Sequence, residues 1–363
     1  MNLSDYNSLC PSCLKPIADD NNFCVGCGCP ISYENKPHQL AVCSALNGKY
    51  YVGKALKEDK SGISYLGLDL TEERKVIIKE FYPKGLVKRL QDGYTVEPGG
   101  IAEEIGKSDA AELWDGYAPE PDENGETEKA PEKSLPDPAK AAEFDKGRSE
   151  FADKASDMAY FRRYKGLAAM LDSFEENGTV YKVLEYTEGK PLSALYDEEG
   201  AIDPEELLVL LEPVFMVVNA FNEVQKVHGG INPDNIIVTD EGARLMDFAD
   251  DLLWQEAEAD KSGYYAPEQY DGHIKTGPHD IGPCTDIYSL AAVYYRGITG
   301  MPPAVAKKRI SWDALSMPTT LNKKINVDTE MAVIKALSVE PSKRYRMASK
   351  FYDDLVSSIL SRK

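Results

Sequence analysis

Most of the seven cysteines lie near the N-terminus, where four of them form two Cys-x-x-Cys pairs. The first pair is Cys10 and Cys13, and the second pair is Cys24 and Cys27. Two tight turns with this spacing can present four thiolates to one tetrahedral zinc ion. The pattern therefore predicts a structural zinc site without an open coordination position. Cys29 follows so closely that it is an alternative to Cys27 as the fourth ligand.

Residues 1–34 resemble a zinc ribbon, with Phe23 before the second cysteine pair and Gly28 after it. About thirty residues cannot build an adequate apolar core, so bound zinc would supply the missing folding free energy. Acidic side chains in this module disfavour nucleic-acid binding, and no thioredoxin-like strand and helix follow that would support a redox role. Beyond its structural role, we expect the module to dock a protein.

A second group of chemically capable residues occupies positions 228–235, which read His-Gly-Gly-Ile-Asn-Pro-Asp-Asn. This octet resembles the catalytic loop of a protein kinase, His-Arg-Asp-x-Lys-x-x-Asn, in which the Asp accepts the substrate proton and the Asn holds magnesium. Gly230 stands at the Asp position, Gly229 at the Arg position and Asn232 at the Lys position, whereas Asn235 matches the metal ligand. The resemblance thus implies a metal ligand without a catalytic base.

Other kinase landmarks occur in order on both sides of this loop. Lys79 ends a Val-Ile-Ile-Lys run that resembles the strand whose Lys contacts the α- and β-phosphates. Asp247 opens Asp-Phe-Ala, where Asp-Phe-Gly places a metal-binding carboxylate. With Asn235, these residues are what the resemblance implies for holding magnesium nucleotide. Residues 79–83, Lys-Glu-Phe-Tyr-Pro, are most similar to bacterial serine/threonine kinases.

Three further matches concern the scaffold of the family rather than its chemistry. Glu268 closes an Ala-Pro-Glu triplet, and Arg344 resembles the late Arg that pairs with it. Asp286 resembles the buried helix Asp that anchors the catalytic loop. Buried charges held by partners persist whether or not a protein catalyses anything, so these residues support the fold only.

The elements that must position these residues change in type along the chain. Short β-rich runs begin near residue 47, and longer helical periods follow after about residue 190, which is the order of lobes in a protein kinase. We expect an α+β, bilobal kinase-like fold at 47–363, after a linker at 35–46. The β-rich lobe would span about 47–186, and the helical lobe about 187–363.

The phosphate-covering loop departs most strongly from the family pattern Gly-x-Gly-x-x-Gly. Residues 57–62 read Lys-Glu-Asp-Lys-Ser-Gly, so only Gly62 remains as a residue that would let backbone amides approach a phosphate. Glu58 and Asp59 also place carboxylates where a triphosphate would lie. Both the geometry and the charge of this loop oppose nucleotide binding.

The helix that should supply a Glu partner to the strand Lys is altered as well. Its nearest match places Lys154 at the Glu position, although a shift of one residue would offer Glu150 or Asp153 instead. Two cations at this point would repel each other. A substitute for the missing base, Asp234 or one of the two Asp residues at 250–251, would have to lie within about 3 Å of the substrate hydroxyl.

Between the Lys strand and this helix lies an acidic insertion at residues 101–140. Its low apolar content and net negative charge predict a disordered loop. The simplest interpretation is a tolerated insertion. The functional alternative is a docking strand with residues 113–117, Leu-Trp-Asp-Gly-Tyr, as its apolar anchor.

Composition sets broad limits on the protein's class. The 363 residues are 42% hydrophobic and 28% charged, with a formal net charge of −20, which disfavours nucleic-acid and anionic-membrane surfaces as partners. No run approaches the roughly 20 apolar residues of a membrane span, and the apolar stretch at 207–221 predicts a buried helix. Without a signal-peptide pattern, we expect a cytoplasmic location.

These observations predict a pseudokinase with an N-terminal zinc ribbon, acting as a protein-interaction or allosteric module on partners that the sequence does not identify. Zinc is the expected cofactor. Magnesium and ATP are candidate ligands of Lys79, Asn235, Asp247 and Gly62, although the altered loop argues against them. The alternative is a divergent active serine/threonine kinase, or another ATP-dependent transferase, that uses these same residues.

Overall fold

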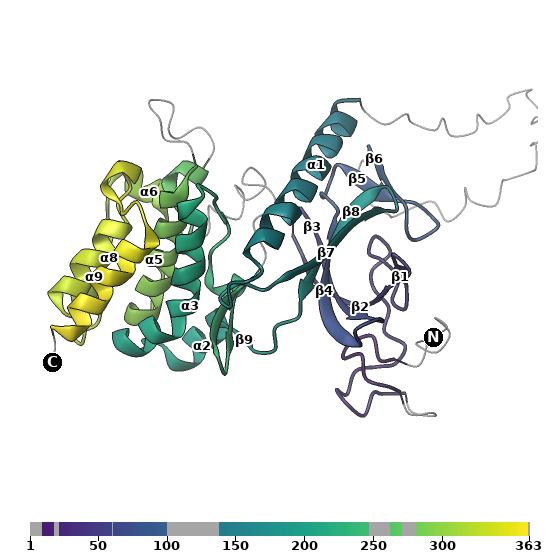
Figure 1. The fold of residues 1–363 in the computed structure, drawn as a ribbon, viewed down its shortest axis with the longest axis horizontal. Coiled ribbons are helices and arrows are strands. Elements are labelled where there is room, and N and C mark those ends of the chain that lie inside the picture. Colours follow the sequence, from purple (N-terminus) through teal and green to yellow (C-terminus); the bar gives the residue numbers. More distant parts are fainter. Residues whose placement is uncertain are drawn as a thin grey trace, which may run out of the picture.

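Two lobes, one rich in strands and one helical, lie side by side (Figure 1). This computed structural model describes residues 9–17, 22–59, 61–99, 138–246, 262–270 and 281–361. The arrangement is the α+β, bilobal architecture expected from the sequence. Most of the predicted insertion, with its anchor at 113–117, and the Asp-Phe-Ala triplet at 247–249 lie outside the described residues.

The strand-rich lobe is built on a six-stranded antiparallel sheet with the order β1-β2-β3-β4-β8-β7. A separate hairpin of two short strands follows β4. The bounds are β1 Ala45–Leu46, β2 Tyr50–Glu58, β3 Gly62–Asp69, β4 Arg74–Phe81, β5 Val87–Arg89, β6 Val96–Pro98, β7 Met170–Glu176 and β8 Thr179–Glu185.

Side chains alternate between the two faces of this sheet, as they must in any strand. On β4, Ile78 lies opposite Val183 of β8 on one face. Lys79 lies on the other face, opposite Ser64 of β3 and Lys182 of β8. The register therefore places two lysines side by side across neighbouring strands.

Helix α1, Pro138–Phe161, covers the face that carries these lysines (Figure 1). Its buried side chains recur at intervals of three, four and seven residues, which is the spacing of one helical face. The ring of Phe81 at the end of β4 lies 5.6 Å from that of Phe144 and 5.3 Å from that of Phe151. The buried residues of the helix are Phe144, Phe151, Ala155, Met158 and Phe161.

The N-terminal module packs against the first strands of the same sheet. Leu9 and Leu14 form a small apolar cluster with Tyr51 of β2 and Leu66 of β3. The backbone N–H of Lys54 donates to the carbonyl of Pro11 over 2.8 Å. Residues 35–46, between the module and β2, also pack on this sheet, since Asn35 hydrogen-bonds to the backbone of Gly53 and Ala55.

The helical lobe surrounds α5, a helix whose residues are almost all buried. The predicted buried helix at 207–221 lies within α3 and continues past Pro213. Among the described residues, no helix is long and apolar enough to cross a membrane. The bounds are α2 Leu192–Glu199, α3 Pro204–Glu223, α5 Pro283–Thr299, α6 Ala306–Ser311, α7 Pro318–Leu321, α8 Val327–Ala336 and α9 Ala348–Leu360.

A three-stranded sheet at the boundary between the lobes holds the loop at 228–235. It has the order β11-β10-β9, with β9 at Lys190–Pro191, β10 at Ile236–Thr239 and β11 at Gly242–Leu245. Arg244 of β11 forms a 3.1 Å ion pair with Glu185 at the end of β8. The loop between α3 and β10 therefore faces the strand-rich lobe from a fixed position.

Candidate functional site

Asp286 of α5 anchors the loop at 228–235, as the sequence predicts. Its carboxylate accepts hydrogen bonds from the backbone N–H of His228 (2.7 Å) and of Gly229 (2.9 Å). Burial raises the pKa of Asp286 to about 7, although the two N–H donors act to lower it. The contact fixes the backbone on the N-terminal side of the predicted base position.

His228 ties the same loop to the end of β11. The Gly230 N–H can only donate and lies 3.2 Å from Nδ1 of His228, whereas the Met246 carbonyl can only accept and lies 2.9 Å from Nε2. These partners select the neutral tautomer with its proton on Nε2. His228 is buried and acts as a structural link, so it is not a proton carrier for substrate.

Gly230, at the position of the catalytic Asp, offers only backbone atoms. Its carbonyl accepts from Nδ2 of Asn232 (3.1 Å) and from Nδ2 of Asn235 (2.9 Å). Asn232, at the catalytic Lys position, also accepts from the N–H groups of Asp234 and Asn235, and so caps the 3₁₀ turn η2, Pro233–Asn235. Asp234 is exposed, and the other two Asp residues considered as a base, at 250–251, lie outside the described residues.

The side-chain amide of Asn235 uses its nitrogen in a hydrogen bond within the loop. Its Nδ2 donates to the Gly230 carbonyl over 2.9 Å, which leaves Oδ1 as the atom that could serve as a metal ligand. An amide oxygen is a suitable ligand for magnesium. Its expected partner Asp247 lies outside the described residues, so Asn235 alone represents the predicted metal site here.

The loop between β2 and β3 binds its own carboxylate. Oδ1 of Asp59 accepts from the N–H groups of Ser61 and Gly62, each over 3.0 Å, and from the Ser61 hydroxyl over 2.7 Å. In a glycine-rich phosphate loop, such N–H groups would point at the ligand. Asp59 therefore supplies the anion that a phosphate would otherwise provide.

Two details of this loop add to the sequence interpretation. A Cβ placed on Gly62 would lie 2.1 Å from the carbonyl oxygen of Glu80, so strand packing alone requires a glycine there. Glu58 does not simply face the nucleotide position, because its carboxylate is held by His38 (2.9 Å) and Gln39 (3.2 Å). Burial acts to raise the pKa of Glu58, but these hydrogen bonds bring it below the ordinary value.

Lys79 is buried, with 6% of its surface exposed, on the sheet face toward α1. Lys154 of that helix is half-buried. The two acidic alternatives point elsewhere, because Asp153 is exposed and Glu150 forms an ion pair with Lys146 of its own helix at 3.7 Å. A shift of one residue in the helix is therefore not what the structure adopts.

Lys182 of β8 is a site residue that sequence reasoning missed. It lies directly opposite Lys79 and is fully buried, with its Nζ 3.8 Å from the centroid of the Phe151 ring. The available signal was a lone lysine within the apolar run Thr-Val-Tyr-Lys-Val-Leu-Glu. Strand alternation alone does not show that such a lysine points inward.

Ile77 is a second residue that the motif comparison overlooked. It stands where the kinase signature Val-Ala-Ile-Lys has alanine, two residues before Lys79 and on the same face. Its neighbours across the strands are Leu66 and Leu184, and it packs against the core of the helical lobe. The position therefore carries a larger apolar side chain than the alanine of the signature.

The predicted scaffold ion pair is confirmed. Arg344 binds Glu268 through two hydrogen bonds of 2.6 and 2.9 Å, and both side chains are fully buried. Thr285 donates a third hydrogen bond to Glu268, over 2.8 Å. This pair joins the segment after the loop to the end of the helical lobe and takes no part in ligand contact.

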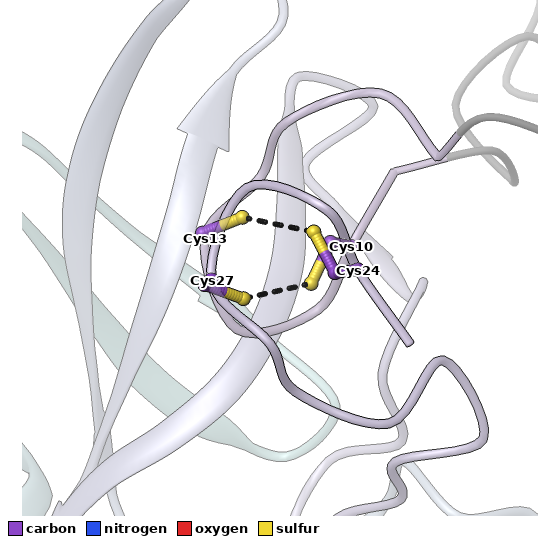
Figure 2. Close-up of side chains that lie close together, drawn as sticks. All are labelled: Cys10, Cys13, Cys24 and Cys27. Carbon is purple, nitrogen blue, oxygen red and sulfur yellow. Dashed lines mark hydrogen bonds between the residues drawn. The ribbon is translucent and has the colours of Figure 1, made fainter. Parts of the chain in front are cut away.

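The four N-terminal cysteines converge on one point (Figure 2). Their Sγ atoms all lie within 4.8 Å of one another, with 3.7 Å between Cys10 and Cys27 and between Cys13 and Cys24. Zinc–sulfur bonds of about 2.3 Å give a tetrahedral edge of about 3.8 Å, so the group fits zinc. Cys29 is outside this group, which favours Cys27 as the fourth ligand.

Local backbone geometry supports the same site. The Gly26 N–H donates to Sγ of Cys24 over 3.3 Å, and this hydrogen bond lowers the pKa of the Cys24 thiol to about 7. Gly28 has a φ of 71°, which closes the second turn in a conformation that glycine adopts readily. A thiolate is the form that binds metal.

Comparison with known proteins is consistent with this geometry. The model of the protein kinase domain family matches residues 145–363, more than half of the chain. The match begins inside α1, so strands β1 to β4, with Gly62 and Lys79, lie outside it. The solved structure described as "PpkA-294 apo form" covers 88% of this chain and 99% of that one, with a TM-score of 0.65 and 24% identity, a likeness that shows the fold alone.

Curated relatives carry the names of kinases. Serine/threonine-protein kinase PknB of Mycobacterium leprae is 25% identical over 237 residues, which are 56% of this chain and 37% of that protein. Serine/threonine-protein kinase PknA of Mycobacterium tuberculosis is 27% identical over 235 residues, 57% of this chain and 52% of that protein. The chain thus spans between about a third and a half of the length of these relatives.

Proposed function

The chain belongs to the protein kinase family, and on that premise we propose that it is a pseudokinase, a protein-interaction or allosteric module without efficient phosphate transfer. The observation that carries this proposal is Gly230. At the position where a kinase has its base, the chain has no side chain, and the Gly230 carbonyl is occupied by Asn232 and Asn235. A substrate hydroxyl would meet no proton acceptor there.

Two further observations support the proposal. Asp59 takes up the amides of Ser61 and Gly62 that would otherwise hold phosphate. Lys154 stands in place of the Glu that orients the strand Lys. Loss of a general base alone costs about 10² to 10⁴ in rate, and positioning and electrostatics supply most of the rest of phosphoryl-transfer catalysis.

The second candidate is a divergent active serine/threonine kinase. The comparisons favour this candidate over the first, since the curated relatives are named as kinases. Lys79 and Asn235 also support it, because both stand where magnesium nucleotide would be held. Gly230 and Asp59 therefore predict one outcome of a transfer assay, whereas the relatives, together with Lys79 and Asn235, predict the other.

Phosphate transfer from radiolabelled ATP with magnesium, to the protein itself and to a generic basic substrate, decides between the candidates. We expect no incorporation above that of an Asp247→Ala variant, which removes the predicted metal ligand. Incorporation that Asp247→Ala abolishes would establish the kinase candidate instead. Gly230→Asp is an informative companion: because the phosphate loop remains altered, restoring the base alone is expected to give little activity.

We also propose that the cysteines at 10, 13, 24 and 27 hold one structural zinc ion. Support comes from the edge lengths between their Sγ atoms and from the turn geometry at Gly26 and Gly28. Four thiolates leave no position for a substrate, so the zinc would fold the module and present it to the sheet through Leu9 and Leu14.

A further inference from the structure

Large apolar side chains are exposed most densely in one part of the helical lobe. Among the described residues, seven of the sixteen exposed large hydrophobic side chains lie between positions 301 and 331. Trp312 is the most exposed of them, at 79%, although tryptophan is highly buried on average. Met317 and Leu321 follow at 50% and 37%. Exposed apolar residues that gather in one place, rather than singly, mark a contact with another protein.

The stretch from α6 to α7 runs along one face of α5. Three hydrogen bonds fix it there, to α5 positions seven and three residues apart, a spacing that keeps them on one side of the helix. Since a helix rises about 1.5 Å per residue, these anchor points span about 15 Å. The residues exposed between them, Trp312, Met317 and Leu321, therefore belong to one compact surface. The three pairs are Arg309 with Tyr288 (2.9 Å), Ser316 with Tyr295 (2.9 Å) and Asn322 with Ile298 (2.8 Å).

The backbone that carries Trp312 is held in place. Its N–H donates to the Lys308 carbonyl over 3.4 Å, where α6 ends. Around it, the side chains of Arg309 and Asp313 are joined by two hydrogen bonds of 2.7 and 3.1 Å. The indole is thus exposed to solvent on a fixed base, so a partner that buries it has little further ordering to impose.

The same stretch is basic within an acidic chain. Residues 305–325 carry five basic residues and one acidic residue, a formal charge of five minus one, or +4, whereas the whole chain has −20. The two carboxylates at the start of α8, those of Asp328 and Glu330, already accept hydrogen bonds within the lobe. The stretch therefore combines exposed apolar side chains with exposed cations. We call it the α6–α7 surface, made of Lys308, Trp312, Met317, Leu321, Lys323 and Lys324.

We propose that the α6–α7 surface binds the acidic insertion of a second copy of this chain. Residues 101–137, which lie outside the described residues, contain twelve acidic residues against three lysines, and they include Leu113, Trp114 and Tyr117. Negative charge and aromatic side chains in one segment are complementary to lysines around an exposed tryptophan. The proposal rests on the proposed function, because it names a partner for the interaction module.

The place of the insertion in the fold favours contact between two copies. The insertion connects β6 to α1 in the strand-rich lobe, whereas α6 belongs to the helical lobe (Figure 1). Each copy then uses its surface toward one neighbour and its insertion toward another, which is a heterologous contact. At 0.15 M salt, a Debye length of about 8 Å screens the net charges of the two copies, so the local complementarity decides.

Sedimentation equilibrium of the full chain at physiological salt tests the contact. We expect the wild type to associate as its concentration rises. Trp312→Ala on the surface and Trp114→Ala on the insertion should each weaken association by at least about tenfold, which is roughly 1.4 kcal/mol. Val209→Ala, at an exposed apolar site on α3, is the matched control and should associate as the wild type does. Because Trp312 is largely exposed, its variant is expected to fold, and an unchanged melting temperature checks this.

A mixture of the two tryptophan variants gives the sharpest test. Trp312→Ala keeps an intact insertion and Trp114→Ala keeps an intact surface, so an equimolar mixture should associate even though each variant alone does not. Replacing both Lys323 and Lys324 by Glu should weaken association as well, since the acidic segment would then face like charge.

Three outcomes would overturn the proposal: a wild type that stays monomeric up to about 100 μM, association unchanged in Trp312→Ala, or a mixture that does not associate although both variants have lost association. Each leaves the pseudokinase proposal intact, because that proposal concerns phosphate transfer. Conversely, transfer by the wild type would remove the pseudokinase proposal, while sedimentation of the mixture would still report on the surface.

Discussion

The helical lobe and the strand-rich lobe treat buried charge differently. In the helical lobe, Glu268 and Arg344 bind each other through two hydrogen bonds, and Asp286 receives two backbone N–H groups. In the strand-rich lobe, Lys79 and Lys182 lie side by side on the face toward α1. The helical lobe thus places a guanidinium or backbone donors against its buried carboxylates, whereas two neighbouring strands of the other lobe each contribute a buried lysine.

The contrast also exists within the strand-rich lobe. On the sheet face away from α1, Glu80 and Arg89 form a buried ion pair of 2.7 Å, and the hydroxyls of Tyr65 and Tyr181 also contact Glu80. On that face, as in the helical lobe, a buried carboxylate is paired with a buried arginine. Among the described residues, the two faces of this sheet therefore carry different buried charges, an ion pair on one face and two lysines on the other.

The family match divides the strand-rich lobe. It begins at residue 145 and covers the helical lobe completely, but it leaves out β2, β3 and β4. The scaffold of the kinase fold is retained where its function is to fold the chain. The unmatched part contains Gly62 and Lys79, whereas β8 with Lys182 lies inside the match, so the match does not end at the border between the lobes.

Removing the zinc site should have the largest effect on stability. The effect should be confined to the strand-rich lobe, against which the N-terminal module packs. Cys24→Ser is expected to bind no zinc, because three thiolates lose much of a metal-binding free energy on the order of 10 kcal/mol. The apolar contact of Leu14 with Tyr51 and Leu66 would be lost with the module. Mass spectrometry of the native protein and hydrogen exchange in β2 and α5 measure both effects.

Cys29→Ser is the matched control, since Cys29 lies outside the group of converging thiols. It should retain one zinc ion and normal exchange. Zinc lost by Cys29→Ser but retained by Cys27→Ser would reverse the choice of Cys27 as the fourth ligand. Faster exchange in α5 as well as in β2 would show that the lobes are more strongly coupled than the comparison assumes.

Breaking the scaffold ion pair should have the next largest effect. Arg344→Leu leaves Glu268 buried without its main partner, which typically destabilises a protein by about 3–5 kcal/mol. Chemical denaturation followed by circular dichroism measures this free energy of unfolding. Lys343→Leu removes an exposed lysine from the next position, where its ion pair with Glu340 lies in solvent, and should cost at most about 1 kcal/mol. Equal losses in the two variants would contradict the assignment of Glu268 and Arg344 to the scaffold.

The buried carboxyl group of Asp286 should make the free energy of unfolding depend on pH. Its pKa is raised by burial to about 7 in the folded protein, so it keeps a proton that the unfolded chain releases near pH 4. The folded state then binds more protons between these values, and the free energy of unfolding falls as pH rises, by up to about 1.4 kcal/mol per pH unit. Asp286→Asn should remove this slope between pH 5 and 7 in denaturation measurements. Asp353→Asn, at an exposed site, should leave the slope unchanged, and an identical slope in Asp286→Asn would assign the titration to another group.

The parts of the fold that sequence reasoning predicted are those with strong local or motif signals. The two lobes, the anchor at Asp286 and the pair of Glu268 with Arg344 all follow motifs whose spacing is characteristic of the family, and the structure confirms them. The convergence of the cysteine pairs follows from their turn geometry. In each case, the interacting residues lie within one short segment or form a pair that is characteristic of the family.

The residues that were missed depend on register between distant strands. Lys182 lies about a hundred positions from Lys79, and only the pairing of β4 with β8 places them together. Asp59 was predicted to repel phosphate, but its contacts with Ser61 and Gly62 were not foreseen. That second omission had a signal, because Asp side chains commonly accept from backbone N–H groups two and three residues ahead.

Substitution of Asp59 should have the smallest effect of the four. It tests the comparison directly, because it changes the loop that would contact phosphate and leaves the buried ion pair of the helical lobe unaltered. Asp59→Ala frees the N–H groups of Ser61 and Gly62 and removes a negative charge from the loop. If this loop lies over bound polyphosphate, ATP affinity should rise by about three- to tenfold, equivalent to roughly 0.7–1.4 kcal/mol, as calorimetry would detect. Glu58→Gln is the control, since that carboxylate is already held by His38 and Gln39, and its effect on affinity should be smaller. Unchanged affinity in Asp59→Ala would mean that the loop between β2 and β3 does not reach the ligand.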